Sequence, residues 1–267
     1  MKDFAFHRPA SVKDAVALLK AHSAGKFLAG GQSLLPVLKL ELADPSDLIS
    51  LAHLKELREI RVDGDKVAIG ALATHDQVHR SPEVHKAIPA LATLAGGIGD
   101  AQVRNRGTIG GSVAHADPAA DYPAAVLGLG ATIVTDRRSI AADDFFTGLF
   151  ATALAADELI TSVHFPVAKR AAYAKFANRA SKYAVVGVFV AETGSGIRVA
   201  VTGAGPKVFR APQYEAALGK KLAPDALDGI AVPAANLNSD AEASADYRAH
   251  LIGVMARRAV AALIGKP

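Results

Sequence analysis

Two short stretches of the chain combine bare backbone with side chains that can donate hydrogen bonds. Residues 27–38, FLAGGQSLLPVL, place two glycines between an apolar run and the pair Gln32–Ser33. Residues 104–123, RNRGTIGGSVAHADPAADYP, repeat the double glycine with a richer polar tail. Glycine permits positive φ and close approach of a ligand, and successive backbone N–H groups can then form an anion-binding nest. The alternative is that each glycine pair only permits a turn, and the spacing alone leaves both interpretations open.

The better-known nucleotide and hydrolase motifs do not account for these glycines. No Gly-x-x-x-x-Gly-Lys-Ser/Thr is present, which excludes a P-loop. GGIGDAQ (96–102) has Gln102 where a Rossmann fingerprint needs glycine or alanine, and no clear strand precedes it. The chain also has no Gly-x-Ser-x-Gly nucleophile elbow. A phosphate site built on these glycines therefore requires another kind of fold.

Other polar clusters are less specific. His75 and His79 stand at i and i+4, a spacing that can ligate a metal on a helix, but no glutamate accompanies them and Asp76 alone is a weak addition. We therefore expect no metal site there. Arg104 and Arg106 are suited to a phosphate or a partner subunit, and a solvated surface explains them equally well.

Composition indicates a soluble, cytoplasmic protein with a large core. The chain has 267 residues, of which 51% are hydrophobic and 21% charged, so we expect two or three compact units. No run of about 18 apolar residues is present, which argues against a spanning helix. The first residues, MKDFAFHRPASVKDA, lack the features of a secretory signal.

The absence of cysteine restricts the chemistry that the chain can do by itself. Without cysteine there are no disulfides, thiolate zinc sites or cysteine-ligated iron–sulfur clusters on this chain, so a redox role needs another electron carrier. The 30 basic residues are scattered among 26 acidic ones and tryptophan is absent, which makes nucleic-acid binding a poor interpretation.

Local patterns predict the elements that would position the glycine stretches. Ser11 as an N-cap with Asp14 three residues later predicts a helix over 11–22, and KFLAGG (26–31) reads as a strand ending at the first glycine pair. Between this pair and the second one, we expect a short helix broken by Pro36, a strand over 47–51, a hairpin around Asp63–Gly64 and helical pieces split by Pro82 and Pro89.

The second half of the chain is predicted to begin with the other glycine stretch, mostly as a loop. A helix passing into a strand follows over 121–135, then a turn at DDFFTG (143–148) and a strand over 158–166. After about residue 170 the pattern is that of an antiparallel sheet followed by helices, the last over 246–264. The apolar stripe of this last helix indicates packing rather than a ligand site; it consists of Leu251, Val254, Met255, Ala259 and Leu263.

The two glycine stretches, taken with their flanks over 26–51 and 104–133, resemble the flavin-binding medium subunit of the molybdenum hydroxylases, such as carbon monoxide dehydrogenase-like and xanthine dehydrogenase-like enzymes. ELITSVHFP (158–166) and YAKFANRASKYAVVGVFVA (173–191) follow in the family's order, so the resemblance covers nearly the whole chain. It implies an α+β FAD-binding fold of the vanillyl-alcohol oxidase (PCMH) type. Two α/β subdomains (1–55 and 56–168) would hold FAD, followed by a C-terminal domain (169–267) with a three-stranded sheet and helices.

The resemblance also implies which residues bind FAD, and it implies no catalytic residue and no metal ligand on this chain. The first loop would follow the diphosphate with Lys26, Phe27, Leu28, Ala29, Gly30, Gly31, Gln32 and Ser33. The second would contact the diphosphate and ribityl portions through Thr108, Gly110, Gly111, Ser112, Asp117 and Asp121. Further contacts would come from Ile160, Lys175 and Tyr183. A cation such as Lys175 near the ring would favour reduced, anionic flavin.

Two positions depart from the family pattern. Ser112 stands where many relatives have asparagine, so the side chain that donates a hydrogen bond there is shorter. Lys182 lies in a segment where relatives often carry an acid, which would alter the charge near the flavin or at a subunit contact.

The function implied is that of an electron-transfer subunit. FAD would take electrons from 2Fe-2S clusters on a small partner subunit, while a large subunit carries molybdopterin, and would pass them to an external acceptor. We expect a dimer of heterotrimers. The substrate and the acceptor stay open, because the substrate is selected at molybdenum on another chain. The alternatives are a self-sufficient FAD oxidoreductase of the same fold and a nucleotide-binding or scaffold module that has lost FAD.

Overall fold

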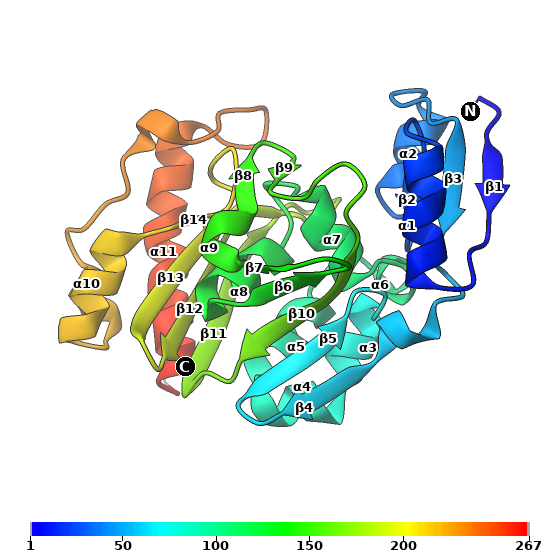
Figure 1. The fold of residues 1–267 in the computed structure, drawn as a ribbon. Helices are drawn as coiled ribbons and strands as arrows, with labels where there is room; N and C mark the ends of the chain where they lie inside the picture. The colour runs from blue at the N-terminus through cyan, green and yellow to red at the C-terminus, as the bar shows by residue number, and fades with distance from the viewer. Residues whose placement is uncertain (1, 266–267) are drawn as a thin grey trace.

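Three larger β-sheets follow one another along the chain in the computed structural model, which describes residues 2–265, and a two-stranded ribbon lies within the second part (Figure 1). The first sheet is parallel and has the order β1-β3-β2, formed by β1 (Ala5–His7), β2 (Lys26–Leu28) and β3 (Asp47–Ser50). Its crossovers are the helices α1 (Val12–Ala21) and α2 (Leu34–Lys39), as parallel strands require. A 3₁₀ turn, η1 (Lys55–Arg58), leads to the second sheet.

The second sheet is antiparallel and has the order β4-β5-β10-β6-β7. Its strands are β4 (Ile60–Asp63), β5 (Lys66–Gly70), β6 (Thr132–Thr135), β7 (Ser139–Ala141) and β10 (Ile160–Pro166). Between β5 and β6 the chain forms the helices α3 (His75–Arg80), α4 (Pro82–Ala87), α5 (Pro89–Gly96), α6 (Ala101–Arg106), α7 (Ile109–His115) and α8 (Tyr122–Leu129). A short helix, α9 (Ala142–Phe145), and the ribbon of β8 (Phe146–Gly148) and β9 (Ala151–Thr152) connect β7 to β10.

The third sheet is antiparallel and has the order β11-β12-β13-β14. Its strands are β11 (Arg170–Ala177), β12 (Ala184–Thr193), β13 (Gly196–Thr202) and β14 (Phe209–Arg210). The chain then forms α10 (Pro212–Lys220), the 3₁₀ turns η2 (Pro224–Leu227) and η3 (Ala234–Asn236), and α11 (Ala245–Leu263). The sheet therefore has a fourth strand, the two-residue β14, beyond the three that the resemblance implied.

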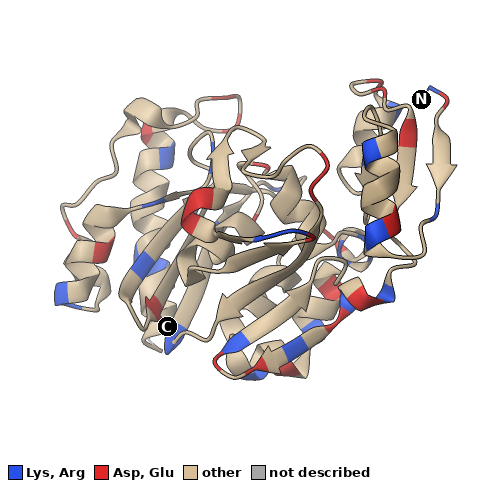
Figure 2. Cartoon of the chain, in the orientation of Figure 1, with Lys and Arg blue, Asp and Glu red and all other residues tan. Residues whose placement is uncertain are grey.

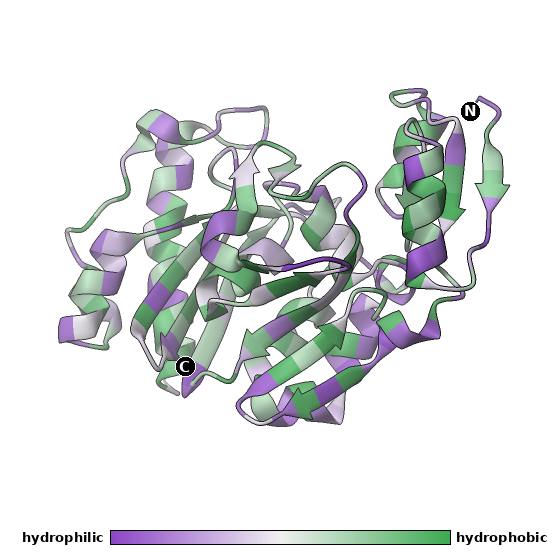
Figure 3. Cartoon of the chain, in the orientation of Figure 1, coloured by the Kyte–Doolittle hydropathy of each residue, from purple (hydrophilic) through white to green (hydrophobic). Residues whose placement is uncertain are grey.

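The third sheet packs against other elements on both faces, and it is most completely buried along β12. Leu251, Met255 and Ala259 of α11 pack with alternate residues of β12 and β13 on one face, as the apolar stripe predicted. On the other face, Phe189 packs in the core that contains α8, every residue of which is buried. Hydrophobic residues are accordingly concentrated on the strands that helices cover (Figure 3). This arrangement joins the C-terminal sheet to the middle of the molecule through a continuous core.

Charges are distributed without a block of one sign in the view of Figure 2, as their scatter along the sequence indicates. Within residues 2–265, no helix has the length and apolar character needed to cross a membrane.

Several local predictions are confirmed by the structure. Ser11 caps α1, its hydroxyl accepting the N–H of Asp14 at 3.1 Å. The hairpin turns at Gly64, which has φ +60°. The α+β class, the strand over 158–166 and the long last helix are also present.

Three local predictions are wrong. The second glycine stretch, predicted as mostly loop, forms α7, because Thr108 caps the helix and its glycines pack closely on neighbouring backbone. DDFFTG is helix α9 passing into β8 rather than a turn. Pro36 does not break α2, since it lies in the first turn, where a missing N–H costs no helical hydrogen bond.

Candidate functional site

A cavity of about 610 Å³ lies between the first glycine loop, the helices after β5 and the turn between β11 and β12. Its walls come from residues within 26–37, 71–121, 152–160 and 181–183, together with Leu51. A second hollow, lined by residues of β4, β5 and β10, measures about 160 Å³. The larger cavity falls within the roughly 300–1,000 Å³ usual for ligand pockets, so it is the candidate site.

The first glycine loop presents unpaired backbone donors to this cavity. It follows β2, whose Leu28 carbonyl accepts the N–H of Leu51 at 3.0 Å. Within the described part of the chain, the N–H groups of residues 30–33 make no hydrogen bond, and the Ser33 hydroxyl does not cap α2. Residues 30–33 all line the cavity. Because a backbone donor left without a protein acceptor is satisfied by water or ligand, this row of donors is an anion-binding feature.

Each glycine of the first loop has its own structural reason to be glycine. Gly31 has φ +77°, a conformation that glycine adopts without strain. At Gly30 a Cβ would lie 2.0 Å from the carbonyl oxygen of Arg106. Gly30 is therefore required by contact with the end of α6, and not only by the approach of a ligand.

The second glycine stretch is a prebuilt wall rather than a nest of free donors. The Thr108 hydroxyl accepts the N–H of Gly111 at 3.1 Å, and the N–H groups of Ile109 and Gly110 bond to Ala73 and Ala71 at 3.1 and 2.9 Å. The Ser112 N–H bonds to the Thr108 carbonyl at 3.0 Å. Of the two interpretations that the sequence left open, the backbone nest therefore does not hold for this stretch, which offers the cavity the hydroxyls of Thr108 and Ser112.

Asp121 lines the cavity, and two side chains from β11 hold its carboxylate. It is 4% exposed, and accepts hydrogen bonds from the Tyr173 hydroxyl and, at 3.0 Å, from Lys175 Nζ. Burial raises the pKa of Asp121, and the Lys175 ammonium followed by the Tyr173 hydroxyl opposes this rise. The ion pair stabilises the carboxylate and balances its charge at this wall.

Lys175 itself does not line the cavity. Its ammonium donates to the carbonyls of Gly97 and Lys182, both at 2.9 Å, as well as to Asp121. These three acceptors occupy its three N–H bonds. Lys175 therefore stabilises the cavity wall from behind. It would affect a ligand only indirectly, through the position and charge of Asp121.

The structure brings together nearly all of the residues proposed for cofactor binding. Apart from Lys175, only Leu28 of that set lies outside the cavity lining. The residues that line it are Lys26, Phe27, Ala29, Gly30, Gly31, Gln32, Ser33, Thr108, Gly110, Gly111, Ser112, Asp117, Asp121, Ile160 and Tyr183. Lys182 also lines it and has φ +65°.

Some residues of the cavity were not anticipated from the sequence. His75 had been considered only with His79, yet His75 lines the cavity beside the Tyr122 ring, whereas His79 Nδ1 lies 3.0 Å from the Ala92 carbonyl. The segment 152–159 also contributes, including Glu158, whose carboxylate is held by Arg138 at 2.8 Å. That hydrogen bond, above all, lowers the pKa of Glu158 to about 2. Long-range pairing places both regions here, and no local motif marks them.

The two arginines beside the second glycine stretch have different surroundings. Arg104 donates to the carbonyls of Ile98 and Gly99, both at 3.1 Å, whereas Arg106 is exposed. Neither lines the cavity.

Comparison with known proteins gives consistent matches over nearly the whole chain. Residues 2–168 match the family described as FAD binding domain in molybdopterin dehydrogenase, and residues 171–263 match the CO dehydrogenase flavoprotein C-terminal domain. The chain is 39% identical to the nicotine 6-hydroxylase medium subunit of Paenarthrobacter nicotinovorans, over 94% of each chain. It is 38% identical to the carbon monoxide dehydrogenase medium chain of Hydrogenophaga pseudoflava, over 96% of each. A solved structure of carbon monoxide dehydrogenase from Hydrogenophaga pseudoflava superposes with a TM-score of 0.90 at 38% identity, over 99% of this chain and 98% of that one.

Proposed function

Since the chain belongs to the family of FAD-binding medium subunits of molybdenum hydroxylases, we propose that its 610 Å³ cavity holds FAD for electron transfer between subunits. In this proposal electrons arrive from iron–sulfur clusters on a partner subunit and leave to an external acceptor. The absence of cysteine supports the first part, because cysteine-ligated clusters must then lie on another chain.

The observation that carries the proposal is the row of unpaired N–H groups over residues 30–33. A diphosphate brings several anionic acceptor oxygens, which match successive backbone donors better than any single side chain does. The hydroxyls of Ser33 and Ser112 add donors without adding charge. Flat aromatic groups need apolar walls, and the cavity offers Phe27, Leu34, Val37, Leu51, Ile98 and Leu154.

The residues of this chain would bind and orient the cofactor. FAD, when bound, supplies the electron chemistry, and the protein supplies position and electrostatic tuning. Loop 30–33 would fix the diphosphate, while α7, which adjoins this loop, and the segment around Asp121 would form further walls. Tyr183, which is 43% exposed in the turn between β11 and β12, would border the opening.

The assembly follows the same reasoning. The relatives are named as medium subunits or chains, which supports a complex with a large molybdopterin subunit and a small 2Fe-2S subunit. A dimer of heterotrimers in the cytoplasm stays our proposal for the complete enzyme.

Cofactor content tests the proposal, and two glycine variants make the test specific to the site. We expect the purified chain, or its complex, to show flavin absorption and to release about one FAD per chain. Gly31→Ala should lose FAD, because the position has φ +77° and a Cβ would lie 2.8 Å from Leu35 Cδ1. Gly229→Ala is the matched control: it has φ +75°, no atom lies within 4 Å of its Cβ position, and it does not line the cavity.

The outcomes separate the alternatives. FAD retention by Gly229→Ala and loss by Gly31→Ala supports binding at the first loop. A colourless wild-type chain that does not take up added FAD would refute the proposal. Steady turnover of a small organic donor by the isolated chain would favour a self-sufficient oxidoreductase.

A further inference from the structure

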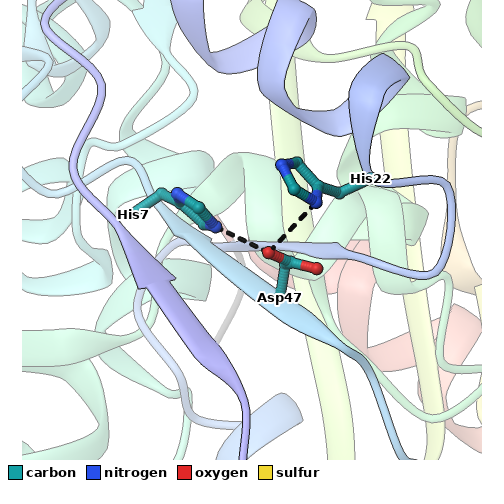
Figure 4. Close-up of side chains that lie close together, drawn as sticks. All are labelled: His7, His22 and Asp47. Atoms are coloured by element: carbon teal, nitrogen blue, oxygen red, sulfur yellow. Dashed lines mark hydrogen bonds and ion pairs between the residues drawn. The ribbon is translucent and has the colours of Figure 1, made fainter.

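Two histidines and a buried aspartate converge at the outer edge of the first sheet (Figure 4). His7 is the last residue of β1, His22 follows the end of α1, and Asp47 begins β3. His7 Nε2 lies 2.6 Å and His22 Nδ1 3.3 Å from the same carboxylate oxygen, Asp47 Oδ1. None of the three residues lines the cavity, so the FAD site does not account for the cluster.

We propose that His7, His22 and Asp47 form a binding site for one Zn²⁺ ion, with a water molecule as the fourth ligand. Imidazole nitrogen and carboxylate oxygen are zinc ligands, at about 2.0–2.2 Å from the metal. In a tetrahedral site, two such ligand atoms lie about 3.3 Å apart. The His22–Asp47 pair already has this spacing, and the candidate ligand atoms of all three residues lie within 4.8 Å of one another.

The hydrogen bond between His7 and Asp47 would open slightly on binding. The distance from His7 Nε2 to Asp47 Oδ1 is 2.6 Å, which is shorter than the roughly 3.3 Å between two ligand atoms of a tetrahedral zinc site. His7 would therefore move outward by about 0.7 Å. His7 can do so because its side chain is 25% exposed and lies on an edge strand that pairs only with β3. His22, with its side chain 41% exposed, leaves the site open to an ion from solvent.

A supporting hydrogen bond orients the carboxylate for this role. Ser46 Oγ donates to Asp47 Oδ2 at 2.6 Å, which leaves Oδ1 directed at the two imidazoles. Carboxylates that ligate metals are usually held in this way by a second hydrogen bond. Asp47 is only 5% exposed, so its position is fixed more firmly than those of the two histidines. It is also the ligand that would bring a negative charge to the ion.

An ion at this position would have a structural role. It would tie together residues 7, 22 and 47, which belong to an edge strand, a helix end and the central strand of the first sheet. The same sheet carries the first glycine loop at the other end of β2. The ion would therefore brace the edge of the layer without touching the cofactor.

Metal titration of the full chain, after chelator treatment and dialysis, tests the site. Co²⁺ serves as the coloured probe and Zn²⁺ as its competitor. We expect one Co²⁺ per chain, with the visible absorption of a four-coordinate site that Zn²⁺ abolishes. His22→Gln and Asp47→Asn should weaken binding at least about tenfold, and Ser46→Ala about tenfold through loss of the supporting hydrogen bond.

His53→Gln is the matched control, because His53 is exposed and lies outside the cluster. It should bind metal as the wild type does. His22→Gln should keep its full FAD content, since the cluster lies apart from the cavity. Because Asp47 is buried, circular dichroism must show that Asp47→Asn is folded; the His22 variant gives the answer independently. No saturable binding, or equal binding by wild type and His22→Gln, would refute the site and leave only a hydrogen-bonded cluster.

Discussion

His75 is an imidazole that the fold keeps neutral. It is 5% exposed, and its Nδ1 has no hydrogen-bond partner among residues 2–265. Burial, with a smaller contribution from the charge of Arg104, lowers the pKa of His75 to about 4. Unfolding returns the side chain to an ordinary pKa of about 6.5. Between about pH 6.5 and pH 4, His75 binds a proton in the unfolded chain but not in the folded one. The free energy of unfolding therefore falls as the pH falls through this interval.

We predict that His75→Gln reduces the acid sensitivity of the protein. In the wild type, His75 should account for the loss of about 2 kcal/mol of unfolding free energy between pH 7 and pH 5. Urea unfolding at the two pH values measures this difference, and His53→Gln serves as the exposed control. Equal pH dependence in wild type and His75→Gln would show that the folded state accommodates the charged imidazole.

At the scale of elements, two similar glycine stretches take different structures. The first leaves its backbone donors free before the six-residue α2, whereas the second is the beginning of α7 and uses its donors internally. Thr108 marks the difference, because its side chain accepts the N–H of Gly111 and so begins the helix. The first stretch therefore has backbone donors free for a ligand, whereas the second forms a fixed part of the cavity wall.

Thr108→Ala should therefore destabilise α7 and weaken FAD binding. Thr108→Ser should have a smaller effect on both. Loss of an N-cap acceptor costs about 1 kcal/mol, and serine retains the hydroxyl. Chemical denaturation gives the stability change, and fluorescence titration with FAD gives the affinity change. If Thr108→Ala and Thr108→Ser behave alike, the hydroxyl does not support the wall.

Local signals in the sequence were sufficient for elements with strong caps and periodicity, such as α1, the β4–β5 hairpin and α11. They failed at α7, because glycine has a low helix propensity and the helix depends on tertiary contact: a Cβ at Gly110 would lie 2.5 Å from that of Ala71. The glycine stretches stood out in the sequence by themselves, but their role in binding FAD came from the resemblance to a family and not from their spacing. The contacts of Lys175 could not be predicted, since its partners Gly97 and Asp121 are 78 and 54 residues away.

At the scale of the whole molecule, the C-terminal sheet holds one wall of the cavity. The fully buried Thr202 of β13 donates to the carbonyls of Pro118 and Ala120, at 2.9 and 2.7 Å. The N–H of Gly203 donates to Pro118 at 2.7 Å as well. These bonds fix the segment that ends at Asp121, so the third sheet acts on a site built mainly by earlier parts of the chain.

We predict that Thr202→Val destabilises the protein by about 1–3 kcal/mol, because the carbonyl of the buried Ala120 loses its donor, whereas that of Pro118 keeps the N–H of Gly203. FAD affinity should fall as well, since the wall around Asp117 and Asp121 loses its anchor. Thr132→Val is the control, a half-buried strand threonine whose hydroxyl makes no hydrogen bond within the described residues. Unfolding curves and FAD titrations of both variants check this, and an unchanged affinity in Thr202→Val would contradict the coupling.

The position of the turn between β11 and β12 has a consequence for protein engineering. The two family matches meet between residues 168 and 171, a natural place to join halves of different relatives. The cavity extends across that junction, because Ser181, Lys182 and Tyr183 line it together with residues before 168. A chimera made there would exchange part of the cofactor's enclosure with the C-terminal half. Residues on both sides of the junction must therefore come from the same relative if the cofactor site is to stay intact. Exchanging one family domain alone would not preserve it.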